Sequence, residues 1–419
     1  MIRRLRTSAV LSLVLVAALA SPPALADGAF PDSLAIYAYP DRPHEIIVTT
    51  NFGLLVSEDD GRTWRWTCEE AILSGVLLYQ GGAAPEHPLY ALAPGGASVT
   101  VDDACSWTGL GPPLDAGYVA DLFPDPTDEP HAFALGAELQ HDELQPLALY
   151  ETHDTGATFQ RVAGLPADTD GSELRSVESA RTNPQVVYVT RELPAAGAVD
   201  LLRSDDGGRS WTTYDLTAVV GPYRTAIAAV DPADAQTIYL RTNAKAGDLL
   251  AISHDGGKTV NVALQLDQAM SAFLRRKDGS LVVGTKSGDQ FLSPDGGQTF
   301  AKWTTAPHLR AIVERDGTLY GAADEFRDGF LVGESTDDGR SWKGLLTYEQ
   351  ICAVPACVAS ACTDALNALR LSLGLGACGK KATTPQATPP RTGCQCGSGP
   401  AGLLALAALG LRRRRCVPR

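Results

Sequence analysis

The segment SDDGGRSW, Ser204 to Trp211, recurs along the chain in near copies, and this recurrence decides the fold. Six segments fit the pattern Ser/Thr-x-Asp-x-Gly-x-Thr/Ser followed by an aromatic residue or Val: SEDDGRTW at Ser57, THDTGATF at Thr152, SDDGGRSW at Ser204, SHDGGKTV at Ser253, SPDGGQTF at Ser293 and STDDGRSW at Ser335. A seventh, TVDDACSW at Thr100, has Ala104 where the others have Gly. The copies start 40 to 52 residues apart, which suits the four-stranded blade of a β-propeller.

Each copy lies between two β-like runs and therefore predicts a hairpin turn. Its carboxylate can accept backbone N–H bonds within the turn, and Gly supplies the positive φ that the turn needs. A calcium loop would need more oxygen ligands than one turn offers, so we interpret these aspartates as structural. They are Asp59, Asp102, Asp154, Asp206, Asp255, Asp295 and Asp337.

These residues resemble the Asp-box, or BNR, repeat of sialidases, sortilin-type receptors, xyloglucanases and photosystem assembly factors, over residues 33–347. The resemblance implies an all-β chain, a seven-bladed β-propeller of four-stranded antiparallel blades, with every repeated turn between the third and fourth strands on one face. Residues 33–39 then open blade one and residues 341–347 close blade seven. No strand is left to interlock the two, so closure is expected to rest on the Cys-rich segment that follows.

The first 26 residues have the features of a secretory signal peptide. Three arginines precede an apolar run over residues 9–20, and the small-residue site Ala24-Leu25-Ala26 follows. The run is too short for a membrane span, which needs about 20 residues. The sequence therefore predicts export, with cleavage before Asp27.

The C-terminal end has the features of a sorting signal. A Pro- and Thr-rich linker, residues 380–393, precedes Cys394 and Cys396, an apolar run over residues 401–411 and four arginines over residues 412–415. Residues 394–419 resemble the myxobacterial C-terminal sorting signal of MYXO-CTERM type. That resemblance implies processing by envelope sorting machinery at Cys394 or Cys396 and anchoring at the cell surface, with membrane contact only through the tail or a lipidated cysteine.

The charge of the chain argues against nucleic acid as a partner. The formal net charge is −14, but eight arginines lie in residues 1–26 and 401–419, which contain no acidic residue, so residues 27–400 carry −22. A surface of that sign repels phosphate backbones, which bind by neutralisation with Lys and Arg.

Six cysteines outside the tail predict three disulfides in an exported chain. Cys68 and Cys105 fall near the outer strands of adjacent blades, so we expect them to pair. Two further disulfides are expected within residues 348–379, a Cys-rich appendix with a helix near residues 363–373, and their connectivity is open: the cysteines are Cys352, Cys357, Cys362 and Cys378. No Cys-x-x-Cys with a matching second pair occurs, so we predict neither a metal site nor a cofactor.

The candidate ligand site lies on the face opposite the repeated turns. There the segments GSELR, GPYR and APHLR place Arg175, Arg224 and Arg310 at the start of the inner strands of blades four, five and seven. Arg is suited to bidentate carboxylate binding, so these residues, with Glu173 and Tyr223 nearby, are candidates to bind an anionic or polyhydroxyl ligand. The alternative is that they form salt bridges at the surface.

We therefore expect an exported, surface-anchored propeller that binds extracellular glycan or protein ligands, without an assignable reaction. The alternative is a glycoside hydrolase or lyase of sialidase or xyloglucanase type acting on extracellular polysaccharide, since sialidases hold a substrate carboxylate with three arginines. The chain departs from that pattern: it has DRPHEI near the first blade in place of Arg-Ile-Pro, and the catalytic Tyr, Glu and Asp find no matching positions. An enzymatic role is thus the less favoured interpretation.

Overall fold

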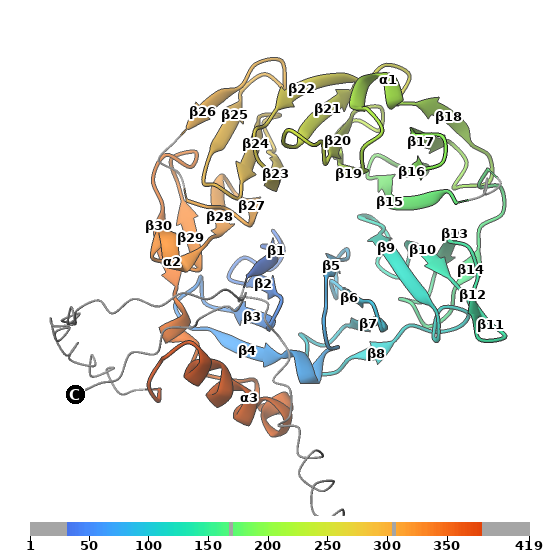
Figure 1. The fold of residues 1–419 in the computed structure, drawn as a ribbon. Coiled ribbons are helices and arrows are strands. Elements are labelled where there is room, and N and C mark those ends of the chain that lie inside the picture. Colours follow the sequence, from blue (N-terminus) through green and yellow to red (C-terminus); the bar gives the residue numbers. More distant parts are fainter. Residues whose placement is uncertain (1–31, 167–170, 304–306, 379–419) are drawn as a thin grey trace, which may run out of the picture. The chain divides into compact units, whose positions relative to one another are not determined.

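The computed structural model of the chain describes residues 32–166, 171–303 and 307–378. These residues form seven four-stranded antiparallel sheets that follow one another along the chain and lie around a central axis (Figure 1). The prediction of a seven-bladed β-propeller is therefore confirmed. The predicted signal peptide, linker and sorting signal, with Cys394 and Cys396, lie outside the described residues.

The first three blades are built from consecutive strands, apart from a small hairpin in the third. Blade one contains β1 (Ser33–Tyr37), β2 (Ile46–Thr50), β3 (Gly53–Ser57) and β4 (Arg65–Cys68). Blade two contains β5 (Leu78–Gly81), β6 (Leu89–Ala93), β7 (Gly96–Thr100) and β8 (Thr108–Gly109). Blade three contains β9 (Tyr118–Pro124), β10 (Ala132–Ala137), β13 (Ala148–Thr152) and β14 (Gln160–Arg161), with the hairpin β11 (Leu139–Gln140) and β12 (Glu143–Leu144) between its second and third strands.

The other four blades follow the same order from inner to outer strand. Blade four contains β15 (Glu173–Ala180), β16 (Asn183–Leu193), β17 (Ala198–Ser204) and β18 (Thr212–Asp215). Blade five contains β19 (Thr225–Val230), β20 (Ile238–Thr242), β21 (Leu249–Ser253) and β22 (Asn261–Gln265). Blades six and seven contain β23 (Met270–Arg275), β24 (Leu281–Thr285), β25 (Gln290–Ser293), β26 (Ala301–Trp303), β27 (Ala311–Arg315), β28 (Thr318–Ala322), β29 (Val332–Ser335) and β30 (Lys343–Leu346).

Helical elements are few and short among the described residues. They are η1 (Glu69–Ala71), α1 (Thr217–Val220), α2 (Glu325–Asp328), η2 (Tyr348–Gln350), η3 (Ala356–Val358) and α3 (Ala359–Ser372). The helix α3 starts four residues before the predicted one, because the turn η3 leads directly into it. Within the described ranges, no helix has the length and apolar character that crossing a membrane requires.

Burial explains why the middle strands are apolar throughout instead of alternating. The strands β3 and β24, with sequences GLLVS and LVVGT, are buried at every position because blades pack on both of their faces. By contrast, the outer strand β22 is exposed or half-buried along its whole length. The hydrophobic core therefore lies between neighbouring blades.

The seven repeated turns all connect the third strand of a blade to the fourth, as predicted. In the turn at Ser204, the Asp206 carboxylate accepts the Ser210 backbone N–H at 2.8 Å and the Ser210 hydroxyl at 2.6 Å. The Ser204 hydroxyl oxygen accepts the Gly208 N–H at 2.8 Å, and the Trp211 indole donates to the Gly208 carbonyl. Equivalent carboxylate contacts occur at Asp59, Asp102, Asp154, Asp255, Asp295 and Asp337.

The turn without glycine keeps this geometry. Asp103 and Ala104 have φ of 55° and 65°, the left-handed region that glycine normally occupies. Asp102 still accepts the Ser106 N–H at 2.8 Å. The adjacent Cys105 forms a disulfide to Cys357, so this turn has a covalent constraint that its copies lack among the described residues.

The ring closes without an interlocked strand, as expected. The strand β1 contacts β27 of blade seven, and the Arg315 side chain donates from blade seven to the backbone carbonyls of Glu45 and Arg42 at 2.6 and 3.1 Å. On the other side, the Ala353 carbonyl accepts the Trp66 N–H at 2.9 Å. The segment after blade seven therefore lies along the outer strand of blade one.

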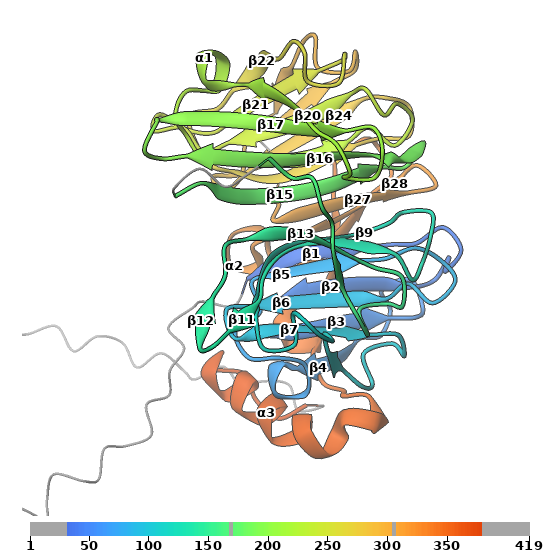
Figure 2. The same ribbon diagram turned by 90° about the vertical axis from the view of Figure 1, so that its right-hand side faces the viewer.

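The disulfide pairing corrects the sequence prediction. All six cysteines pair, giving the expected three disulfides, but Cys68 bonds to Cys362 and Cys105 bonds to Cys357. Only Cys352–Cys378 lies within the appendix. The predicted Cys68–Cys105 pair and the second disulfide inside the appendix are wrong, because α3 packs against β4 and brings its own cysteine to Cys68 (Figure 2).

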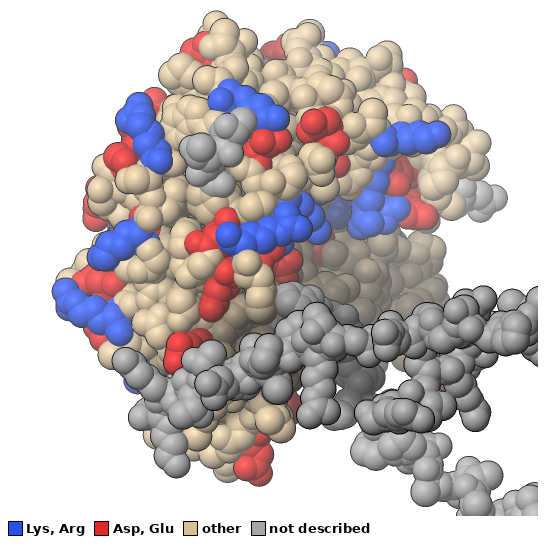
Figure 3. Space-filling model, turned by 60° about the vertical axis from the view of Figure 1, so that its left-hand side comes forward, with Lys and Arg blue, Asp and Glu red and all other residues tan. Residues whose placement is uncertain are grey.

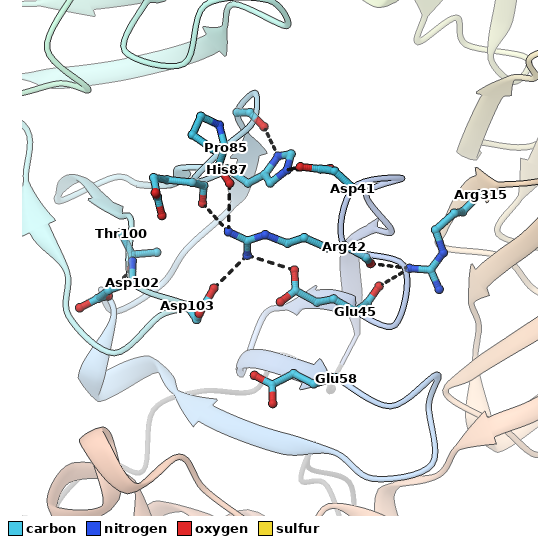
Figure 4. A network of polar contacts seen from close by, with 12 residues as sticks. Asp41, Arg42, Glu45, Glu58, Pro85, His87, Thr100, Asp102, Asp103 and Arg315 are labelled. Carbon is cyan, nitrogen blue, oxygen red and sulfur yellow. Dashed lines mark hydrogen bonds and ion pairs between the residues drawn. The ribbon is translucent and has the colours of Figure 1, made fainter.

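A polar network joins blades one, two and seven beside the repeated turns (Figure 4). The Arg42 guanidinium contacts Glu45 within blade one and reaches Asp103 of blade two at 2.9 Å and the Glu86 carbonyl at 2.9 Å. His87 of blade two contacts the Asp41 carboxylate at 2.9 Å. These contacts run between side chains and backbone of the same chain, so we interpret the network as part of ring closure.

Candidate ligand-binding face

The propeller has two faces that carry different loops. Because all seven sheets have the same strand order from the axis outward, the repeated turns share one face, which we call the turn face. The loops between second and third strands, and those between blades, share the opposite face, which we call the loop face. The arginines singled out in the sequence all precede or begin inner strands at the loop face.

Arg175, in β15, already has carboxylate partners. Its Nε and Nη2 atoms donate to the two carboxylate oxygens of Glu192 at 2.8 and 2.9 Å, and Nη2 also contacts Glu173. Glu173 and Glu192 face each other across β15 and β16. A ligand carboxylate at this guanidinium would have to compete with both of them.

Arg310, at the junction of blades seven and one, also has carboxylate partners with which a ligand would compete. Its Nε donates to Asp32 at 2.8 Å and its Nη2 donates to Asp324 at 3.1 Å. The remaining Nη1 is buried and has no hydrogen-bond partner among the described residues. One edge of this guanidinium therefore has no partner among the described residues, but it is shielded from solvent.

Arg224 and Tyr223 differ from the other two positions. Both side chains are exposed ahead of β19, and within the described ranges no side chain forms an ion pair with Arg224. The three arginines start different blades, and no contact joins their side chains in the described residues. They remain candidate ligand residues, with Arg224 the most accessible.

A pocket on the loop face lies between blades three and four, and sequence reasoning missed it. Its volume is about 440 Å³. It is lined by Pro146, Leu147, Ala148, Arg161, Val162, Ala163, Gly164, Leu165, Pro166, Ser172, Leu174 and Arg191. The segment after β14 forms one wall, and its Gly164 and Pro166 are the only loop signal that the sequence offered.

The two guanidinium groups of this pocket are not equivalent. Arg191 is buried and bonds to the buried Asp200 at 2.7 Å, so its charge is neutralised. Arg161 is exposed, and among the described residues it has no ion-pair partner. The pocket therefore combines one available cation with an apolar wall that includes Leu147, Leu165 and Leu174.

Charge elsewhere on the surface is mixed. On the part of the surface drawn in Figure 3, the Lys and Arg side chains lie among Asp and Glu side chains and do not gather into one patch. Exposed lysines and arginines pair with acidic residues elsewhere in the described structure, as Lys343 does with Glu334 and Arg65 with Glu58. No extended basic surface is visible in this view.

Two carboxyl groups on inner strands have strongly raised pKa values. Burial raises the pKa of Asp121 in β9 to about 7 and that of Glu178 in β15 to about 8. Asp121 accepts the Val177 N–H at 2.9 Å, and Glu178 accepts the Val230 N–H at 2.7 Å. Each bond joins one blade to the next, so these groups connect inner strands.

Comparison with known proteins identifies the fold and leaves the function open. No protein-family model matches the chain, and no curated protein matches it. Similar solved structures include YCF48 from Cyanidioschyzon merolae (13% identity, TM-score 0.47, 71% of this chain and 94% of that one) and the GH74 xyloglucanase of Xanthomonas campestris (14%, 0.37, 78% and 65%). The S511A mutant of puromycin hydrolase matches with 12% identity and a TM-score of 0.54 over 75% of this chain, which spans about half the length of that protein. At such identities the likeness shows the propeller fold alone.

Proposed function

We propose that this chain is an exported, surface-anchored propeller of the Asp-box repeat type that binds an extracellular glycan or protein ligand on its loop face. The observation that carries the binding role is the pocket between blades three and four, with exposed Arg161 above an apolar wall. The shared hydrogen bonds of the seven repeated turns support the assignment to the repeat type. The segments at residues 1–26 and 394–419 support export and anchoring.

The pocket lining favours binding over hydrolysis. Glycoside hydrolysis ordinarily uses two carboxyl groups on either side of the scissile bond. The described residues of the pocket offer two guanidinium groups and a serine, but no carboxylate, thiol or imidazole. None of these described lining residues is suited to act as general acid or base, so this lining favours holding and orienting a ligand.

The same lining indicates the chemistry of the ligand. An exposed guanidinium binds a carboxylate through charge-assisted hydrogen bonds, and the apolar wall accepts a sugar ring face or an apolar side chain. A net charge of −22 on residues 27–400 disfavours a long polyanion. We therefore expect a ligand with a single carboxylate beside an apolar surface, such as an acidic sugar unit or the C-terminus of a peptide.

The test is a binding screen of the full chain on arrays of acidic glycans and of peptides, followed by affinity measurement with the best ligand. Arg161→Ala is expected to weaken binding by about 10-fold or more, the scale of a charged hydrogen bond. Arg181→Ala is the matched control, because Arg181 is exposed in the turn between β15 and β16 on the opposite face. Equal affinity of Arg161→Ala and the native chain would contradict the proposal, as would turnover of fluorogenic glycosides that persists in this variant.

Export and anchoring need their own experiment. We expect the mature chain to begin at Asp27 and to fractionate with the cell surface, and replacement of Cys394 and Cys396 by Ser to release it into the medium. N-terminal sequencing and fractionation measure both. Retention of the full chain in the cytoplasm would contradict this part of the proposal without affecting the binding test.

A further inference from the structure

A cluster of three potential metal ligands lies on the turn face of blade three. Among the described residues, His131, Glu151 and His153 form a group in which one donor atom from each lies within 4.8 Å of the others. The cluster is on the face opposite the Arg161 pocket and involves none of its residues. Any role that it has is therefore independent of the ligand site proposed above.

Strand register explains why these three side chains meet. The strands β10 and β13 pair antiparallel, with Ala132 opposite Thr152 and Phe133 opposite Glu151. One step further along this register, His131 comes opposite His153, and their rings stack with centroids 4.6 Å apart. Glu151 and His153 are two residues apart and so project from the same side of the chain. The sequence Glu-Thr-His was the only local signal of this arrangement.

His131 is oriented by a carboxylate, as metal-binding histidines commonly are. The residue is 7% exposed, and its Nδ1 contacts the Asp125 carboxylate at 3.0 Å. Asp125 is itself fixed by the Thr127 backbone N–H and hydroxyl, at 2.8 and 2.7 Å. A carboxylate at Nδ1 keeps the proton on that atom and leaves the Nε2 lone pair free to bind a metal.

The Nε2 atom of His131 is buried and has no hydrogen-bond partner in the described structure. It lies 3.9 Å from Glu151 Oε2, and His153 Nε2 lies 3.7 Å from the same oxygen. Two ligands of one tetrahedral zinc ion, each about 2.1 Å from the metal, are about 3.4 Å apart. All three donors lie within 4.8 Å of one another, but the two rings are stacked with an interplanar angle of 11°. Metal binding therefore requires the exposed His153 ring to turn, so that its lone pair points at the same ion as His131 Nε2.

We infer that His131 Nε2, Glu151 and His153 form a Zn²⁺ site on the turn face of blade three, with water in the remaining coordination position. Two imidazoles and a carboxylate are a donor set that zinc accepts, and three protein ligands leave one position open. Glu151 is half-buried and His153 is exposed, so an ion can reach the site from solvent. The competing interpretation is an ion pair between protonated histidines and Glu151, which would bind no metal.

Titration of the chelator-treated full chain with Co²⁺ tests this inference, since Co²⁺ takes zinc geometry and absorbs visible light. We expect one equivalent to bind with d–d absorption and without a thiolate charge-transfer band, and Zn²⁺ to displace it. His153→Ala and, independently, Glu151→Gln should each raise the Co²⁺ dissociation constant by at least about 10-fold.

His254→Ala is the matched control. His254 occupies the same turn position in blade five and is exposed, but it contacts Thr237 instead of a second histidine. This variant should bind Co²⁺ like the native chain. The inference is overturned if the native chain binds no Co²⁺ stoichiometrically, if both site variants bind like the control, or if the absorption shows thiolate ligands, which would place the ion at tail cysteines.

Discussion

Cys68 and Cys362 form a disulfide that joins the outer strand of blade one to α3, across 294 positions of the sequence. The helix follows blade seven, so this bond fixes the end of the propeller to its beginning. Residues of blade one, blade seven and α3, including Trp66, Val332 and Leu366, pack in one buried cluster at the same place. Ring closure therefore depends on the appendix, as the absence of an interlocked strand from the described blades requires.

Replacing both Cys68 and Cys362 by Ala should lower the free energy of unfolding by roughly 2–5 kcal/mol, because the unfolded chain loses a loop-closing constraint. With Cys105–Cys357 intact, that loop has 37 positions from 68 to 105 and 5 from 357 to 362, about 42 in all. Urea denaturation of the oxidised protein measures this. The comparison variant lacks Cys352 and Cys378, whose bond spans only 26 positions, and should lose less. An equal loss in both variants would argue against a special role of the first disulfide in closure.

The repeated turns predict a steep acid transition. In the turn at Ser204, hydrogen bonds from the Ser210 hydroxyl and backbone amide lower the pKa of Asp206 to about 2, and Asp59, Asp295 and Asp337 have pKa values of about 2 for similar reasons. Since the unfolded chain binds protons more readily than these native carboxylates, stability is lost as pH falls from about 4 to 2. Thermal melts over this range should show a falling melting temperature, and Asp206→Asn should show a shallower decline.

Asp121 predicts the opposite dependence at higher pH. Burial raises its pKa to about 7, so the native state keeps its proton more readily than the unfolded state, and stability is lost as pH rises from about 4 to about 7. Asp121→Asn retains an oxygen for the Val177 N–H and removes the ionisation. The variant should melt about 2–4 °C higher than the native chain at pH 8, and this difference should disappear at about pH 4. Asp115→Asn, at an exposed position, should behave like the native chain at both pH values.

Replacing the loop-face arginines should change the free energy of unfolding by amounts that depend on whether each arginine has an ion-pair partner. Arg310→Ala leaves Asp32 and Asp324 without their guanidinium at the junction of blades seven and one, and should lower the free energy of unfolding by about 2 kcal/mol. Arg224→Ala removes an exposed side chain and should change it by less than about 0.5 kcal/mol. Chemical denaturation of both variants decides the matter, and equal stability would mean that the Arg310 ion pairs are unimportant for closure.

Local chemistry explains why the fold could be predicted. Each repeated turn is stabilised by contacts between residues two to four positions apart, such as Ser204, Asp206 and Ser210, so its pattern is visible in a short window. Seven such windows at nearly constant spacing set the number of blades. The continuous apolar strands beside them, such as β3, then follow from burial on both faces.

Long-range contacts explain why the disulfides, ion pairs and candidate sites could not be predicted from the sequence. The partner of Cys68 is 294 positions away and is decided by where α3 packs once the ring has closed. Arg175 is paired by Glu192, which the register of β15 and β16 places opposite Glu173, two residues away. His131 meets Glu151 and His153 only through the pairing of β10 with β13.

The sequence by itself determined the repeat, the blade count and the structural role of the turn aspartates, because hydrogen bonds within eight residues suffice for them. Only the tertiary structure decided which cysteines bond, which arginines remain accessible and which histidines approach one carboxylate. These depend on side chains brought together across blades and strands, and such distances are set by packing of the whole ring.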